Sequence, residues 1–149
     1  MLKTTISGLA LLLIASATVL AGEIDLEGVK CVVAPKNAQV SKSADYKKGK
    51  VYFCCGGCQG KFTKDSKPFA MKANQQLVST KQYEQKACPL SGGDLDPETA
   101  IKVAGTKVAF CCGNCKAKVE SSEDAEAMKL VFADKAFDKA FKKVEAKKN

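Results

Sequence analysis

The segment Lys50-Val51-Tyr52-Phe53-Cys54-Cys55-Gly56-Gly57-Cys58-Gln59-Gly60-Lys61 recurs later in the chain as Lys107-Val108-Ala109-Phe110-Cys111-Cys112-Gly113-Asn114-Cys115-Lys116-Ala117-Lys118. The two copies are identical at 8 of their 12 positions. One further cysteine precedes each copy, and the step from Lys50 to Lys107, here called the repeat offset, also leads from Cys31 to Cys88. All eight cysteines therefore form two sets with the spacing Cys-x22-Cys-Cys-x2-Cys: Cys31, Cys54, Cys55, Cys58 and Cys88, Cys111, Cys112, Cys115. This duplication predicts a tandem of two small cysteine-centred units.

Residues 1–22 have the pattern of a secretory signal. Lys3 supplies a positive charge, residues 8–20 are mostly apolar, and residues 19–21 end on a small residue, as a signal peptidase requires. The apolar run is shorter than the ~20 residues of a spanning helix. We therefore expect cleavage, a periplasmic or secreted protein, and no stable membrane insertion afterwards; an uncleaved N-terminal anchor is the alternative. The remainder divides into a first repeat, residues 23–80, and a second repeat, residues 81–149.

The size and composition of the chain limit the kinds of function it can have. Each repeat has only about 60 residues, and a domain of that size needs disulfides or a metal to supplement its small core. The net charge of +8 is carried by lysine, without arginine or histidine. Lysine lacks the planar fork that reads phosphates and base edges, so we interpret the charge as solvated surface and expect no nucleic-acid partner. Without histidine the usual general base is missing, so we expect no enzyme and a soft-metal site built from sulfur.

Turn residues and β-prone runs predict a β-hairpin in front of each cysteine cluster. In the first repeat the second strand ends at Cys54, and Gly49 is the turn signal. In the second repeat the strands cover residues 101–103 and 107–110 and turn around Gly105. A helix after each cluster completes a small α+β unit.

Apolar periodicity predicts the remaining helices. A helix over residues 68–77 is expected to connect the two units. Another is expected over residues 122–132, with Ser121 and Asp124 as a capping box. A last helix is expected over residues 134–147, packed on the second unit. Its apolar face would consist of Phe137, Phe141 and Val144.

The cysteine spacing suits a metal ion. Where a strand ends at Cys54 and a helix follows, Cys54 and Cys58 lie about one turn apart and can meet Cys31 around an ion at about 2.3 Å. Adjacent Cys54 and Cys55 would point to opposite faces of a strand, so one of them can lie outside the coordination sphere. Four sulfurs would favour structural zinc, and three with an open position would favour an exchangeable ion such as Cu⁺. We expect one ion per repeat, Zn²⁺ or alternatively Cu⁺.

Three cysteines of each repeat resemble a family motif. The motif Cys-x(19–22)-Cys-x3-Cys of the TRASH domains matches two sets of residues: Cys31, Cys54, Cys58 and Cys88, Cys111, Cys115. These treble-clef-like modules are related to YHS domains and are associated with heavy-metal trafficking, resistance and sensing. Phe53 and Phe110 match the aromatic residue before the second cysteine. The resemblance implies metal binding through these cysteines by two treble-clef-like units.

The chain also departs from that family. Cys55 and Cys112 are additional to its motif, and neither repeat has the Tyr-His-Ser tripeptide of YHS domains. After its first cysteine the second repeat has Pro89 and Gly92, and neither is matched at the equivalent position of the first repeat. Five lysines near the clusters are expected to help lower the thiol pKa values, unless they form only a solvated basic face: Lys50, Lys61, Lys107, Lys116 and Lys118.

Two other functions fit parts of the pattern. An even number of cysteines after a signal sequence suits a secreted interaction module stapled by disulfides within each repeat. The Cys-x-x-Cys pairs, Cys55 with Cys58 and Cys112 with Cys115, occur in thiol–disulfide oxidoreductases, but the βαβ pattern of thioredoxin is missing. A third cysteine beside each pair fits metal binding better. The sequence identifies no protein partner.

Overall fold

The computed structural model describes residues 24–145, and the expected signal segment, residues 1–22, lies outside them. The described residues form an α+β fold, which confirms the predicted fold class. None of their helices is long and apolar enough to cross a membrane. In chain order the elements are β1 (Gln39–Tyr46), β2 (Gly49–Phe53), α1 (Gly56–Lys64), the 3₁₀ turn η1 (Lys67–Phe69), α2 (Ala70–Ser79), β3 (Tyr83–Gln85), β4 (Asp96–Val103), β5 (Thr106–Phe110), α3 (Gly113–Glu120), α4 (Asp124–Phe132), α5 (Asp134–Ala140) and β6 (Phe141–Lys143).

The repeat in the sequence is also a repeat in the fold. The repeat offset leads from the bounds of β1 and β2 to those of β4 and β5, and from the start of α1 to the start of α3. Both hairpins are antiparallel, and both have an irregular register after the first residue of their first strand. That residue pairs with the phenylalanine that ends the second strand, Gln39 with Phe53 and Asp96 with Phe110. The predicted hairpin and helix around each cysteine cluster are confirmed.

Both hairpins turn through two residues in the left-handed conformation. The angle φ is 46° at Lys47 and 63° at Lys48 in the first hairpin, and 47° at Ala104 and 81° at Gly105 in the second. Two left-handed residues give the turn that matches the right-handed twist of paired strands. Lysine adopts this conformation at a backbone cost that glycine avoids, so strand pairing must offset it.

Gly49 closes the turn that the sequence suggested and also has a packing role. It is the first residue of β2 and follows the turn. A Cβ at this position would lie 2.8 Å from Cδ2 of Leu77 and 2.9 Å from Oε1 of Gln82. Glycine is therefore favoured by close packing of β2 against α2 and the residues after it. The turn that Gly49 signalled is present at Lys47 and Lys48, directly before it.

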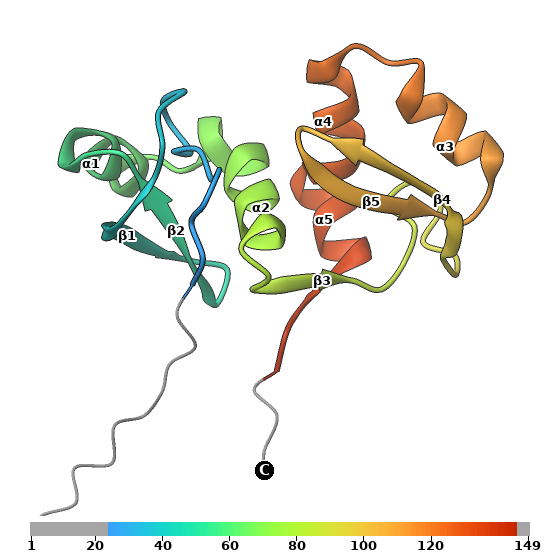
Figure 1. Cartoon of the computed structure of the whole chain (residues 1–149), viewed down its shortest axis with the longest axis horizontal. Helices are drawn as coiled ribbons and strands as arrows, with labels where there is room; N and C mark the ends of the chain where they lie inside the picture. Colours follow the sequence, from blue (N-terminus) through green and yellow to red (C-terminus); the bar gives the residue numbers. More distant parts are fainter. Residues whose placement is uncertain (1–23, 146–149) are drawn as a thin grey trace, which may run out of the picture.

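α2 is the predicted helical connector, and it lies between the first hairpin and helices α4 and α5 (Figure 1). Its Ala73 and Leu77 are fully buried in the hydrophobic core. The amide of Asn74, also buried, donates to the carbonyl of Phe132 at 2.9 Å and to Oδ1 of Asp134 at 2.9 Å. α2 thus packs against both halves of the chain. The predicted boundary between the repeats falls in the turn after α2, and the division into domains stays a prediction.

The end of the chain differs from the predicted long helix. α5 stops at Ala140, and Phe141 is extended, with φ −116° and ψ 139°. The chain then forms β6, antiparallel to β3, while the carbonyl of Ala140 accepts bonds from Lys86 and Ala87 N–H. Phe137 and Phe141 are both buried with their ring centroids 5.3 Å apart, as a core role requires. The helix prediction was wrong for residues 141–145 because it ignored this distant strand partner.

The predicted capping box of α4 was also wrong. Glu123 is the N-cap of α4, and no side-chain capping bond is formed there. Ser121 instead ends α3, where its N–H donates to the carbonyl of Ala117. The hydroxyl of Ser122 donates to the carbonyl of Lys118 at 2.7 Å. These two serines therefore satisfy the end of α3 and not the start of α4.

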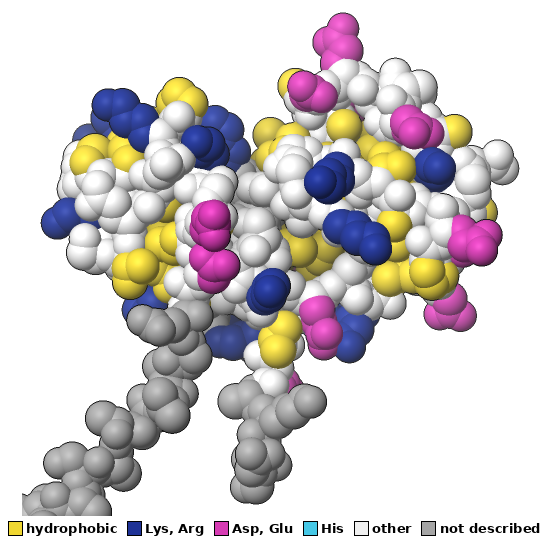
Figure 2. Space-filling model, viewed as in Figure 1, with side chains coloured by type: hydrophobic (Ala, Val, Ile, Leu, Met, Phe, Trp, Pro, Cys, Tyr) yellow, Lys and Arg dark blue, Asp and Glu magenta, His cyan; other side chains and the backbone are white. Residues whose placement is uncertain are grey.

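Charge is distributed over the surface. On the face in Figure 2, lysine, acidic and apolar side chains all occur over both halves of the molecule. Lys50, for example, pairs with Asp45 at 2.8 Å, with both side chains largely exposed. This distribution is compatible with the solvated basic surface expected from the sequence.

Candidate metal centres

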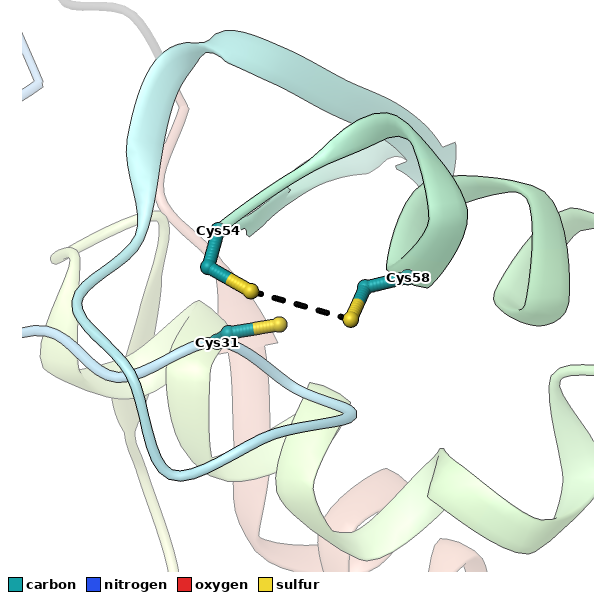
Figure 3. Close-up of side chains that lie close together, drawn as sticks. All are labelled: Cys31, Cys54 and Cys58. Atoms are coloured by element: carbon teal, nitrogen blue, oxygen red, sulfur yellow. Dashed lines mark hydrogen bonds between the residues drawn. The ribbon is translucent and has the colours of Figure 1, made fainter.

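The first triad consists of Cys31, Cys54 and Cys58. Cys54 directly follows β2, Cys58 lies in the first turn of α1, and Cys31 lies in the loop before β1. Figure 3 shows the three thiol groups pointing toward one another from these three segments. Their sulfur atoms all lie within 4.8 Å of one another, and the Sγ atoms of Cys54 and Cys58 are 3.7 Å apart.

The second triad consists of Cys88, Cys111 and Cys115, at the equivalent positions of the second repeat. Its sulfur atoms also lie within 4.8 Å of one another, and the Sγ atoms of Cys111 and Cys115 are 3.6 Å apart. The same geometry is therefore built twice. In both repeats a strand that runs into a helix supplies two thiols, and a preceding loop supplies the third.

These separations suit a thiophilic ion. Four sulfurs bound tetrahedrally at about 2.3 Å would lie about 3.8 Å from one another. The observed separations of 3.7 and 3.6 Å are close to this value. Each triad could therefore hold a metal ion with little movement of the sulfur atoms. The donor set alone does not distinguish zinc from Cu⁺.

Each triad has a buried side and an accessible side. Cys31 and Cys88 are 4% and 0% exposed, whereas the other two cysteines of each triad are half-buried. Phe62 from α1 is buried in the first repeat, and its ring packs against Phe53 with the centroids 5.3 Å apart. Val119 is buried at the equivalent place in α3. The apolar core thus supports one side of each sulfur cluster.

Backbone N–H groups favour a thiolate at Cys31. Burial raises the pKa of this thiol, but the N–H groups of Cys54, Val33 and Ala34 outweigh burial and lower the pKa below its ordinary value. The N–H of Val33 donates to the sulfur at 3.4 Å. By contrast, burial and the neighbouring thiols raise the pKa of Cys58 to about 12. The Cys58 thiol is therefore protonated at neutral pH. A metal ion that binds its sulfur would displace this proton, so metal binding would release protons.

The second triad has an additional hydroxyl group. Burial raises the pKa of Cys88, but the Ser91 side chain and nearby N–H groups lower it overall to about 6. The Oγ of Ser91 also lies 3.1 Å from Sγ of Cys111. The first repeat has Ala34 at the equivalent position, one repeat offset earlier. Ser91 was not among the predicted site residues, although comparing the two repeats position by position would have found it.

Lysines do not account for these pKa shifts. The main contributions to the pKa values of Cys31 and Cys88 come from burial, backbone N–H groups and neighbouring side chains, and no lysine is among them. The five lysines are therefore not the main cause of the lowered pKa values of the two buried thiols, and a smaller influence stays a prediction. Short-range hydrogen bonds replace the long-range charge effect that the sequence suggested.

Cys55 and Cys112 lie outside the triads. The Sγ of Cys55 is 3.8 Å from that of Cys54, and the Sγ of Cys112 is 3.7 Å from that of Cys111. Each is the N-cap residue of the helix that follows, α1 or α3. The structure thus brings six of the eight predicted ligands into two compact groups and places the other two beside them. Metal binding by any of the eight stays a prediction.

Two buried or half-buried glutamines hold the strands that lead to the triads. Gln76 of α2 accepts from the N–H of Tyr52 at 2.6 Å and donates to the Tyr52 carbonyl at 3.0 Å and the Lys30 carbonyl at 2.9 Å. Gln85 of β3 accepts from the N–H of Ala109 at 2.9 Å and donates to its carbonyl at 2.7 Å. These bonds fix the backbone close to the cysteines. Neither glutamine was predicted from the sequence, because their partners are distant in the chain.

Comparisons of this chain with protein-family models, with curated proteins and with solved structures found no match. The arrangement of the sulfur atoms is therefore the basis for any functional conclusion.

Proposed function

We propose that this chain is an exported, TRASH-like metal-binding protein that holds one soft cation, zinc or Cu⁺, in each cysteine triad. Its place of action would be the periplasm or the cell exterior. Its role would be metal trafficking or resistance, or a structural one in which the metal stabilises each unit, and not catalysis. The observation that carries this proposal is the duplicated triad, in which three thiols from separate segments approach within 4.8 Å in both repeats.

Sulfur chemistry supports a soft cation. Thiolates select Cu⁺ and Zn²⁺ over hard ions such as Mg²⁺ and Ca²⁺, which prefer oxygen. Three sulfurs suit Cu⁺ directly, whereas zinc would need a fourth ligand from solvent or from a neighbouring thiol. The half-buried sulfurs of each triad leave one side of the group accessible to such a ligand.

Metal titration of the reduced, metal-free protein tests the proposal. We expect each triad to take up one Zn²⁺ or Cu⁺ ion, with elemental analysis and native mass spectrometry as the readout. Cys58→Ser should remove the ion of the first triad, and Cys115→Ser that of the second. Substoichiometric binding of both metals to the wild-type protein with all thiols reduced would contradict the proposal.

A disulfide-stapled module is the competing function. All eight cysteines are free in the structure. Alkylation of protein taken from its native compartment, followed by intact-mass analysis, separates the two cases. Labelling of the cysteines after metal removal, without reductant, supports metal ligands. Labelling only after reduction supports disulfides and contradicts the metal-binding proposal.

A further inference from the structure

We propose that Cys55 and Cys112 are exchange ligands, which take a soft cation from a thiol carrier at the surface and pass it to the triad behind them. This inference rests on the proposed metal-binding function and adds the route by which the metal arrives and leaves. The carrier is identified only by its chemistry: a small molecule or protein that presents the cation on a thiolate.

The first observation is a gradient of accessibility among the four thiols of the first repeat. Cys31 is buried, Cys54 and Cys58 are half-buried, and Cys55 is exposed. A Cβ added at Gly56 would meet no atom within 4 Å, and one added at Gly57 would meet only the Cys55 sulfur, at 3.9 Å. The two glycines therefore leave open space beside the Cys55 thiol, through which a carrier can approach.

The second observation is the distance between the outer thiol and the triad. The Sγ of Cys55 lies 3.8 Å from that of Cys54, and the Sγ of Cys54 lies 3.7 Å from that of Cys58. Both values match the separation of about 3.8 Å between two sulfurs bound to one ion. One cation can therefore be shared by Cys55 and Cys54 and then by Cys54 and Cys58. Cys54 belongs to both arrangements and is the common ligand.

The third observation is that the short sulfur–sulfur distance recurs in the second repeat. Cys112 is half-buried, as Cys111 and Cys115 are, and its Sγ lies 3.7 Å from that of Cys111. The outer thiol does not belong to the compact group of three in either repeat. Cys55 is thus not an isolated thiol, since it contacts a triad and has a counterpart in the same position on the other one.

The transfer balances without a change of oxidation state. The thiols of Cys55 and Cys54 each release a proton to solvent as their sulfurs bind the cation, and one carrier thiolate leaves and takes up a proton for each of these two bonds. The thiol of Cys58 then loses a proton and binds the cation while Cys54 stays bound, and the bond to Cys55 breaks. Cys55 regains a proton from solvent. No electrons are transferred, and the same steps in reverse would release the cation to an acceptor.

Transfer kinetics test this inference. Purified full-length protein, reduced and metal-free, is mixed with Cu⁺ bound to glutathione, and uptake is followed by stopped-flow absorbance for the wild type, Cys55→Ser, Cys112→Ser and the double variant. We expect the double variant to retain one ion per triad at equilibrium. Its uptake rate should fall at least about tenfold, the lower end of what losing a group beside a metal centre costs. Each single variant should slow one of two phases.

Lys64→Ala is the matched control, because it alters the exposed surface of α1 and leaves every thiol in place. It should bind and take up Cu⁺ as the wild type does. If the serine variants take up the ion at the wild-type rate, the outer thiols are bystanders and the inference is wrong. If they lose the ion at equilibrium, the outer thiols are permanent ligands and the inference is again wrong, although the metal-binding function stands. Failure of the wild type itself to bind Cu⁺ or Zn²⁺ would overturn both the exchange-ligand inference and the proposed metal-binding function.

Discussion

Gln76 and Gln85 make the same contacts in the two repeats, although the repeat offset does not relate their positions in the chain. Each binds the N–H and the carbonyl of one strand residue, Tyr52 or Ala109, and these two residues do occupy equivalent positions of the repeat. Gln76 belongs to α2, which follows its strand, whereas Gln85 belongs to β3, which precedes its strand. The strand beside each triad is thus held by the same pair of hydrogen bonds, although the glutamine that makes them comes from a different element in each repeat.

We predict that Gln76→Leu destabilises the protein by about 2–4 kcal/mol, because it leaves the buried N–H and carbonyl of Tyr52 and the partly buried carbonyl of Lys30 without this partner. Gln75→Leu is the control. Gln75 is only half-buried; it donates to the carbonyl of Ala104 in an exposed contact and to the hydroxyl of Thr106 in a partly buried one, where water can replace it at least at Ala104. Its loss should cost less than about 1 kcal/mol. Urea denaturation measures both values, and equal stability of the two variants would refute the role given to Gln76.

Gly49→Ala tests the close packing of β2. The added methyl would lie 2.8 Å from Leu77 Cδ2, so we expect a loss of about 1–3 kcal/mol from overpacking. Gly60→Ala is the matched control, since Gly60 lies in α1 with no atom within 4 Å of an added Cβ. That change should stabilise the protein by about 0.5–1 kcal/mol through helix propensity. Thermal unfolding should show a lower melting temperature for Gly49→Ala and a higher one for Gly60→Ala. An unchanged melting temperature for Gly49→Ala would show that close packing does not favour glycine there.

Ser91→Ala should move metal loading of the second triad to higher pH. The hydroxyl helps hold the pKa of Cys88 down at about 6, so its loss raises that pKa and protons compete with the metal over a wider range. Ala34→Ser places a hydroxyl at the equivalent position of the first triad and should move loading there to lower pH. A zinc titration at a series of pH values, with the other triad blocked by Cys58→Ser or Cys115→Ser, measures each midpoint. Unchanged midpoints would show that Ser91 does not affect the sulfurs.

Asp134 should contribute stability that disappears in acid. The Asn74 amide, and to a lesser extent Lys47, keep the pKa of this carboxyl below its ordinary value despite partial burial. A carboxyl whose folded-state pKa is lowered stabilises the fold above its unfolded pKa of about 4 and loses this contribution as pH falls further. Asp134→Asn should therefore be less stable than the wild type at neutral pH, by about 1 kcal/mol or less for so exposed a group. The difference in stability between the wild type and Asp134→Asn should shrink below about pH 4. A difference that stays constant with pH would show that ionisation of Asp134 does not stabilise the fold.

Local patterns explain why the hairpins and triads could be predicted. The segments around Cys54 and Cys111 contain a β-prone run, paired cysteines and glycine in close succession, and the duplication doubles the evidence. A strand that continues into a helix brings residues four apart onto the same side. The convergence of Cys54 and Cys58 therefore follows from local geometry.

Long-range partners explain the errors. Phe141 continues a helical apolar pattern, but β3 offers it strand pairing from a segment far earlier in the chain. The turn beside Gly49 was predicted, but its packing role was missed, because the side chains that favour a glycine there belong to Leu77 and Gln82. Neither partner is visible in a local window. The same limit concealed Gln76 and Gln85.

The most direct test of the central claim is X-ray absorption at the metal edge of the loaded protein, compared with Cys58→Ser. We predict a sulfur shell at about 2.3 Å around each ion in the wild type, and loss of the first-repeat ion alone in the variant. A shell of oxygen and nitrogen only, or loss of both ions on changing Cys58, would contradict two independent sulfur centres.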